Sequence, residues 1–92
     1  MHVSLIVSGR VQMVRFRVFV VKWAQYYDVC GTVQNNGDGT VKIEAWGSKE
    51  SLQLLIQKVH KGSRLSRVDN VAEVWDNKGY SNSEPRIFKL IH

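Results

Sequence analysis

The hydrophobic positions of this 92-residue chain recur with two different periods, and each change of period marks a new structural element. Near the N-terminus, Val3, Leu5 and Val7 occupy every second position. This alternation is typical of a strand with one buried face. We therefore predict a first strand over residues 2–8, which ends near Gly9 and runs into the stretch GRVQMVRFRVFV.

A different spacing follows. Apolar residues three and four positions apart, typical of one helix face, run through Phe16, Phe19, Val20, Trp23, Ala24 and Tyr27. Alternating apolar residues over 14–20 would also fit a strand, but the helical set is longer. We predict a helix from about Phe16 to Tyr27, and this spacing places Phe16, Phe19 and Trp23 in the core.

The strongest local signal is the segment GTVQNNGDGTVKIEAWG, residues 31–47. Val33 leads into Asn36-Gly37-Asp38-Gly39, four residues that tolerate positive φ. Apolar residues then alternate on the way out, at Val41, Ile43 and Ala45. This arrangement predicts a β-hairpin.

The second half of the chain repeats the order of helix and strand. Ser48 can cap a helix whose apolar stripe ends at Gly62. A fourth strand is indicated by Val68, Val71 and Val74, and IFKLI, residues 87–91, indicates a closing strand after a polar excursion over 77–85. The order β-α-β-β-α-β predicts an α+β, ferredoxin-like sandwich: an antiparallel sheet with two helices on one face and a short extra C-terminal strand. We expect residues 1–92 to form a single domain.

Composition narrows the function classes. The chain is 43% hydrophobic with a net charge of +5, which favours anionic partners. No apolar run approaches membrane-spanning length, and no signal peptide is evident, so we expect a cytoplasmic protein without a membrane partner. Cys30, the single cysteine, lies between apolar neighbours and is expected to be a buried structural thiol. The histidines, His2, His60 and His92, stand too far apart to indicate a metal site, and we expect no metal or other cofactor.

The loop between the first strand and the first helix is the candidate site. Its backbone N–H groups approach the positive end of the helix dipole, where a phosphate can bind. Arg17 at the helix start can present a planar fork of donors to two phosphate oxygens. Residue chemistry equally allows Arg17 to pair with a carboxylate or to be solvated. Arg10 and Arg15 flank the loop and either raise the local positive potential or are solvated, and we favour solvation.

At these positions the chain resembles the acylphosphatase family. Gly9-Arg10-Val11-Gln12, then Val14 and Phe16-Arg17, is similar to that family's phosphate-loop signature. Gly31-Thr32-Val33-Gln34-Asn35 looks like its second motif, and further matches extend over essentially the whole chain. Two motifs at the right separation on a matching order of elements are more specific than a lone glycine loop.

The resemblance implies a small metal-free hydrolase that cleaves acyl phosphates into a carboxylate and inorganic phosphate, which would also compete for the site. Nothing in the sequence demands more than a monomer, and we expect one. Arg17 and Asn35 would be the catalytic residues, with Asn35 holding the attacking water. The phosphate-binding loop would comprise Gln12, Met13, Val14, Arg15, Phe16 and Arg17. Asn36 competes with Asn35 for this role, but turn formation with Gly37 accounts for Asn36.

One position departs from the family pattern. Met13 stands where the family usually has glycine. If the loop requires a left-handed backbone here, methionine costs on the order of 1–2 kcal/mol. We therefore keep a second hypothesis, a catalytically weak phosphate-binding or regulatory module. A third hypothesis is single-stranded RNA binding. The sequence lacks the glycine-aromatic strand signature of RNA-recognition sheets, so we do not expect nucleic acid as a partner.

Overall fold

The computed structural model describes residues 1–77 and 86–91 and contains two helices and five strands in these ranges. The elements in chain order are β1 (His2–Arg10), α1 (Phe16–Tyr26), β2 (Cys30–Asn35), β3 (Val41–Trp46), α2 (Lys49–Lys61), β4 (Arg67–Asp76) and β5 (Phe88–Ile91). This order confirms the predicted one. The predicted polar excursion falls largely on residues 78–85, which lie outside the described residues.

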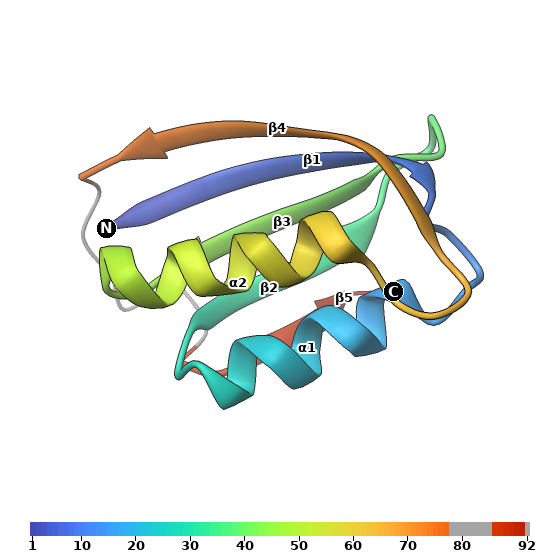
Figure 1. Cartoon of the computed structure of the whole chain (residues 1–92). Helices are drawn as coiled ribbons and strands as arrows, with labels where there is room; N and C mark the ends of the chain where they lie inside the picture. The colour runs from blue at the N-terminus through green and yellow to red at the C-terminus, as the bar shows by residue number, and fades with distance from the viewer. Residues whose placement is uncertain (78–85, 92) are drawn as a thin grey trace.

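The strands form one sheet in the order β4-β1-β3-β2-β5, and both helices cover the same face (Figure 1). The pairs β1–β3, β1–β4 and β2–β3 are antiparallel, as predicted. The added strand β5 pairs with β2 in parallel, so the sheet is mixed. The fold is ferredoxin-like, with a parallel edge strand that the sequence pattern had not specified.

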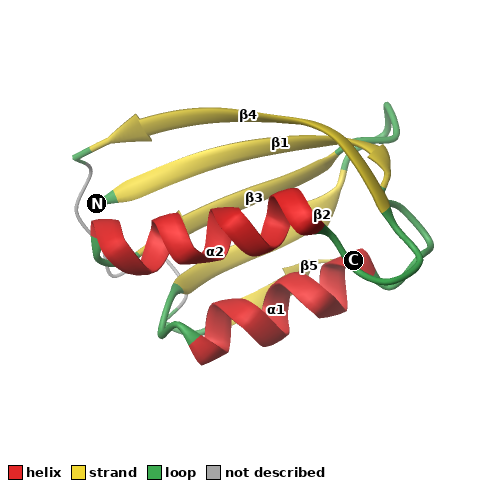
Figure 2. Cartoon of the chain, in the orientation of Figure 1, coloured by secondary structure: helices red, strands yellow, loops and turns green. Residues whose placement is uncertain are grey.

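Figure 2 shows the two helices packed on one face of the sheet, and the residues of the hydrophobic core come from both layers. Its fully buried residues include Val3, Leu5 and Val7 of β1, which confirms the predicted inner face of that strand. Phe16 is buried, whereas Phe19 and Trp23 are only partly buried and pack against the core from its margin. None of the described helices is long and apolar enough to span a bilayer.

The helix ends follow local sequence signals. Ser48 caps α2, because its Oγ accepts a hydrogen bond of 3.1 Å from the backbone N–H of Ser51. Gly62 ends that helix with φ 75°, and Asp28 follows α1 with φ 60°. The loop before α1 and the loop after α2 lie at the same end of the sheet (Figure 1).

Candidate active site

The loop of residues 11–15 begins at an irregularity in the sheet. The register between β1 and β4 shifts between Ser8 and Gly9, which is the mark of a β-bulge. Gly9 has φ 123°, and a Cβ at this position would overlap the carbonyl oxygen of Arg67. Only glycine therefore fits where the chain turns out of the sheet and into the loop.

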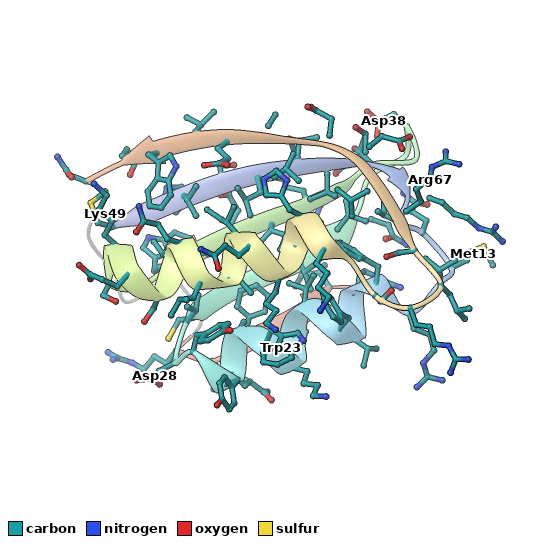
Figure 3. All side chains as sticks on the ribbon, in the orientation of Figure 1. Met13, Trp23, Asp28, Asp38, Lys49 and Arg67 are labelled. Atoms are coloured by element: carbon teal, nitrogen blue, oxygen red, sulfur yellow. The ribbon has the colours of Figure 1, made fainter. Side chains whose placement is uncertain are left out.

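Two non-glycine residues of the loop adopt the left-handed backbone conformation. Met13 has φ 62° and Arg15, the residue that precedes α1, has φ 63°. Met13 therefore takes the strained conformation considered from the sequence, while its side chain is 98% exposed (Figure 3). Backbone strain of this kind is concentrated at functional sites.

The loop leaves a set of backbone donors available. Within the described part of the chain, no hydrogen bond is donated by the backbone N–H groups of residues 12–17. The first α1 bond to the loop is donated by Phe19 N to Arg15 O, at 3.2 Å. Successive free N–H groups at a helix N-terminus form a binding site for an anion.

Gln12 connects this loop to the hairpin. Its Nε2 donates hydrogen bonds of 2.8 Å to Asn36 O and 2.9 Å to Thr40 O. Two bonds from one amide hold the loop against the turn between β2 and β3. The side chain of Gln12 was not predicted to have this role, because no local sequence pattern indicates its two distant acceptors.

The hairpin presents two neighbouring asparagines in different roles. Asn36 Nδ2 donates to Thr40 Oγ1 at 2.9 Å, so this side chain belongs to the turn. The side-chain Oδ1 of Asn35 is buried and has no hydrogen-bond partner among the described residues. An unsatisfied buried acceptor costs about 1–3 kcal/mol, so Asn35 is the asparagine with a free hydrogen-bonding group. All four turn residues 36–39 tolerate positive φ, but only Gly39 adopts it in the structure.

Arg17 lies beside the same end of the hairpin. Its Nη1 donates a hydrogen bond of 2.8 Å to the carbonyl oxygen of Ile91 in β5. Ile91 pairs with Gln34, the residue before Asn35. Thus the fold brings the predicted Arg17, Asn35 and loop 12–17 to one end of the sheet.

A small cavity of about 70 Å³ lies at this end, and Arg17 and Arg15 are among its lining residues. Arg15 and Arg10 are exposed, as predicted. The loop of residues 62–66 after α2 lies near the loop before α1 (Figure 1), and its Ser63 Oγ donates a hydrogen bond of 3.4 Å to Val14 O. Arg64 belongs to that loop, so guanidinium groups from two loops make this end of the molecule electropositive.

Two other groups considered from the sequence have structural partners. His2 is buried, and its ring nitrogens lie 2.9 Å from Glu44 Oε2 and 3.0 Å from Asp76 Oδ2. Cys30 is half-buried, and its Sγ lies 3.1 Å from Arg86 O, so the prediction of a buried thiol was wrong. The cause is the position of Cys30 at the first residue of β2, where the sheet ends. Over residues 1–77 and 86–91, no three His, Cys, Asp or Glu side chains form a group able to hold a metal ion.

Comparison with known proteins supports the resemblance found in the sequence. The family model described as acylphosphatase matches residues 3–86. An acylphosphatase of Salinibacter ruber is 44% identical over 83% of this chain and 80% of its own length. The crystal structure of acylphosphatase from Bacillus subtilis superposes with a TM-score of 0.91 at 32% identity, covering 99% of this chain and 98% of that one. An acylphosphatase from Coxiella burnetii superposes with a TM-score of 0.84 at 30% identity, covering 98% and 90%.

Proposed function

The chain belongs to the acylphosphatase family, and from this premise we propose that it hydrolyses acyl phosphates without a metal, with Arg17 and Asn35 as its catalytic residues. The products are a carboxylate and inorganic phosphate. Inorganic phosphate, which presents the same oxygens as the substrate, also binds as a competitive ligand.

The phosphoryl group sits on the free backbone N–H groups of residues 12–17. These donors satisfy its oxygens, and the left-handed backbone of Met13 and Arg15 supports the cradle without glycine at either position. Arg17 adds donors from its guanidinium, since one Nη1 bond to Ile91 leaves its other N–H groups available. Each charge-assisted bond contributes roughly 1.5–3 kcal/mol.

Asn35 holds the attacking water, and its buried, unpaired Oδ1 is the observation that carries this proposal. The oxygen accepts a hydrogen bond from one water O–H, which turns the lone pair of the water toward phosphorus. Gln12 supports this arrangement because it holds the phosphate loop beside the residue that follows Asn35. Such positioning supplies a large part of the rate enhancement in phosphoryl transfer.

In the reaction, the water oxygen forms a bond to phosphorus while the bond from phosphorus to the acyl oxygen breaks. The carboxylate leaves with the electron pair of that bond. No carboxylate or imidazole occurs in residues 11–17 or 34–36, so the proton of the water passes to a phosphoryl oxygen of the substrate. The charge that develops on the equatorial oxygens is met by Arg17 and the backbone N–H groups.

The test is hydrolysis of benzoyl phosphate with a chelator present, for the wild type, Arg17→Ala, Asn35→Ala and Asn36→Ala. We expect turnover by the wild type and a loss of about a hundredfold or more in kcat for the first two variants. Asn36→Ala is the matched control and keeps most of the activity, because Asn36 serves the turn. Equal losses in Asn35→Ala and Asn36→Ala would reject the assigned role of Asn35.

The alternative is a phosphate-binding or regulatory module without effective turnover, and it is distinguished by binding. Titration of inorganic phosphate into Asn35→Ala is expected to give a Kd close to that of the wild type, because Asn35 holds water and not phosphate. A wild type that binds phosphate but leaves benzoyl phosphate intact would favour the module.

We further propose that the protein acts as a cytoplasmic monomer. Size-exclusion chromatography tests the oligomeric state, and cell fractionation tests the compartment.

A further inference from the structure

A second hollow adjoins the phosphate cavity. This groove, of about 320 Å³, lies between the start of α1 and the loop of residues 62–66. Arg15 and Val18 line both the groove and the smaller cavity that contains Arg17. A ligand with its phosphoryl group at Arg17 can therefore extend past these two residues into the groove.

The walls of the groove are mainly apolar. Val14, Phe19 and Leu65 line it together with Val18. Val18 and Leu65 are 52% and 63% exposed, so a ligand in the groove would remove apolar surface from water. An acyl group larger than acetyl would make this contact.

Two guanidinium groups flank this apolar surface. Arg15 and Arg64 line the groove, and neither forms an ion pair within the described residues. By contrast, Arg67 at the start of β4 forms an ion pair with Asp69, in which Arg67 Nε lies 3.0 Å from Asp69 Oδ1. Among the residues that the structure describes, no carboxylate lines the groove. A ligand with an apolar body and a negative charge would therefore fit the groove.

We propose that this groove, formed by Val14, Arg15, Val18, Phe19, Arg64 and Leu65, binds the acyl part of the substrate and selects acyl phosphates with an apolar body and a second anionic group. The inference rests on the proposed hydrolysis at Arg17, and it assigns the preference for the second anion to Arg64. Arg64 lies outside the phosphate loop, so its role can be separated from the chemistry.

The test compares 4-carboxybenzoyl phosphate with 4-carbamoylbenzoyl phosphate, which has nearly the same shape without the charge. The para position keeps the carboxylate from attacking the acyl phosphate within the same molecule. For the wild type we expect kcat/KM to be about fivefold higher for the carboxylate, because an exposed ion pair contributes up to about 1 kcal/mol. Arg64→Gln should bring this ratio to within about twofold of unity, because the ratio cancels any effect that the variant has on both substrates alike.

Arg10→Gln is the matched control. It removes the same charge from an exposed arginine that lines neither hollow, so it is expected to keep the ratio of the two substrates. Leu65→Ser tests the apolar wall, and should lower kcat/KM for benzoyl phosphate several-fold while leaving acetyl phosphate unaffected. Circular dichroism of each variant verifies the fold.

The outcomes separate the two claims. Loss of the ratio in Arg64→Gln but not in Arg10→Gln supports the groove as the acyl subsite. An unchanged ratio in Arg64→Gln, or an equal change in both variants, overturns this inference while the hydrolytic function stands. A wild type that hydrolyses none of these acyl phosphates would overturn the proposed function and this inference with it.

Discussion

Arg17 Nη1 donates a hydrogen bond to Ile91 O across 2.8 Å, although 74 positions separate the two residues in the chain. The bond holds the first turn of α1 against the parallel strand β5. Because Ile91 pairs with Gln34, it also fixes the guanidinium near the end of β2 that carries Asn35. The candidate catalytic groups thus depend on the edge strand for their relative position.

Arg17→Lys tests whether the fork geometry is needed. A lysine ammonium can bond to Ile91 O or to the phosphoryl group, but it lacks the planar donors that serve both. We expect kcat/KM for benzoyl phosphate to fall about a hundredfold, measured by the loss of absorbance of the substrate. Arg10→Lys is the control and should remain near the wild type. Retention of more than a third of the activity by Arg17→Lys would contradict the fork.

Gln12→Ala removes both hydrogen bonds from the phosphate loop to the hairpin turn. The acceptors Asn36 O and Thr40 O lose a partner, and we expect the free energy of unfolding to fall by about 1–3 kcal/mol. The activity should fall as well, since the loop loses its position beside Asn35. Urea denaturation and benzoyl phosphate kinetics measure the two effects. Gln25→Ala, at an exposed glutamine of α1, should change neither, and a stable, active Gln12→Ala would refute the role of this contact.

Met13→Gly should relieve the left-handed strain of the loop. The side chain of Met13 is 98% exposed, so its removal costs almost no packing. We expect Met13→Gly to unfold with a free energy about 1 kcal/mol higher than that of Met13→Ala, which keeps the Cβ at φ 62°. Chemical denaturation of both variants measures the difference. Equal stabilities would mean that the loop carries no such strain, and a gain in kcat/KM for Met13→Gly alone would show that the strain weakens phosphate binding.

The stability of the hairpin turn is expected to depend on pH through the carboxyl group of Asp38. The hydroxyl of Thr40 donates to Asp38 Oδ1 at 2.6 Å and Thr40 N donates at 3.0 Å, and these bonds lower the pKa of the Asp38 carboxyl below its ordinary value. Because the lowered pKa belongs to the folded state, the stabilisation is present above the ordinary pKa of aspartate. It is lost as the pH falls through the lowered value.

Thr40→Val removes the larger of these two causes. We expect the pKa of Asp38, measured by NMR titration, to rise toward the ordinary aspartate value in this variant. The difference in stability between wild type and variant should shrink in acid, below the ordinary pKa. Thr32→Val, on the neighbouring strand, is the control that should leave Asp38 unchanged. An unaltered Asp38 titration in Thr40→Val would show that the hydroxyl does not hold the carboxylate.

Local patterns predicted most of the fold. The helix from Phe16 was predicted within one residue of its observed end at Tyr26, and the caps at Ser48 and Gly62 were predicted correctly. These signals act over a few positions, through side-chain periodicity and backbone preference. The parallel pairing of β5 with β2 had no such signal, because the apolar pattern of a four-residue strand does not indicate the direction in which it pairs.

For the candidate site, the sequence by itself determined the residue types and their order: a loop with Arg17 at its end and Asn35 before a turn. Only the tertiary structure decided what these groups meet. Gln12 bonds to Asn36 across 24 positions and Arg17 bonds to Ile91 across 74, and the groove of about 320 Å³ is lined by residues of α1 and of the loop after α2. Contacts at such separations depend on how the sheet is ordered and packed, and no local preference of the chain encodes them.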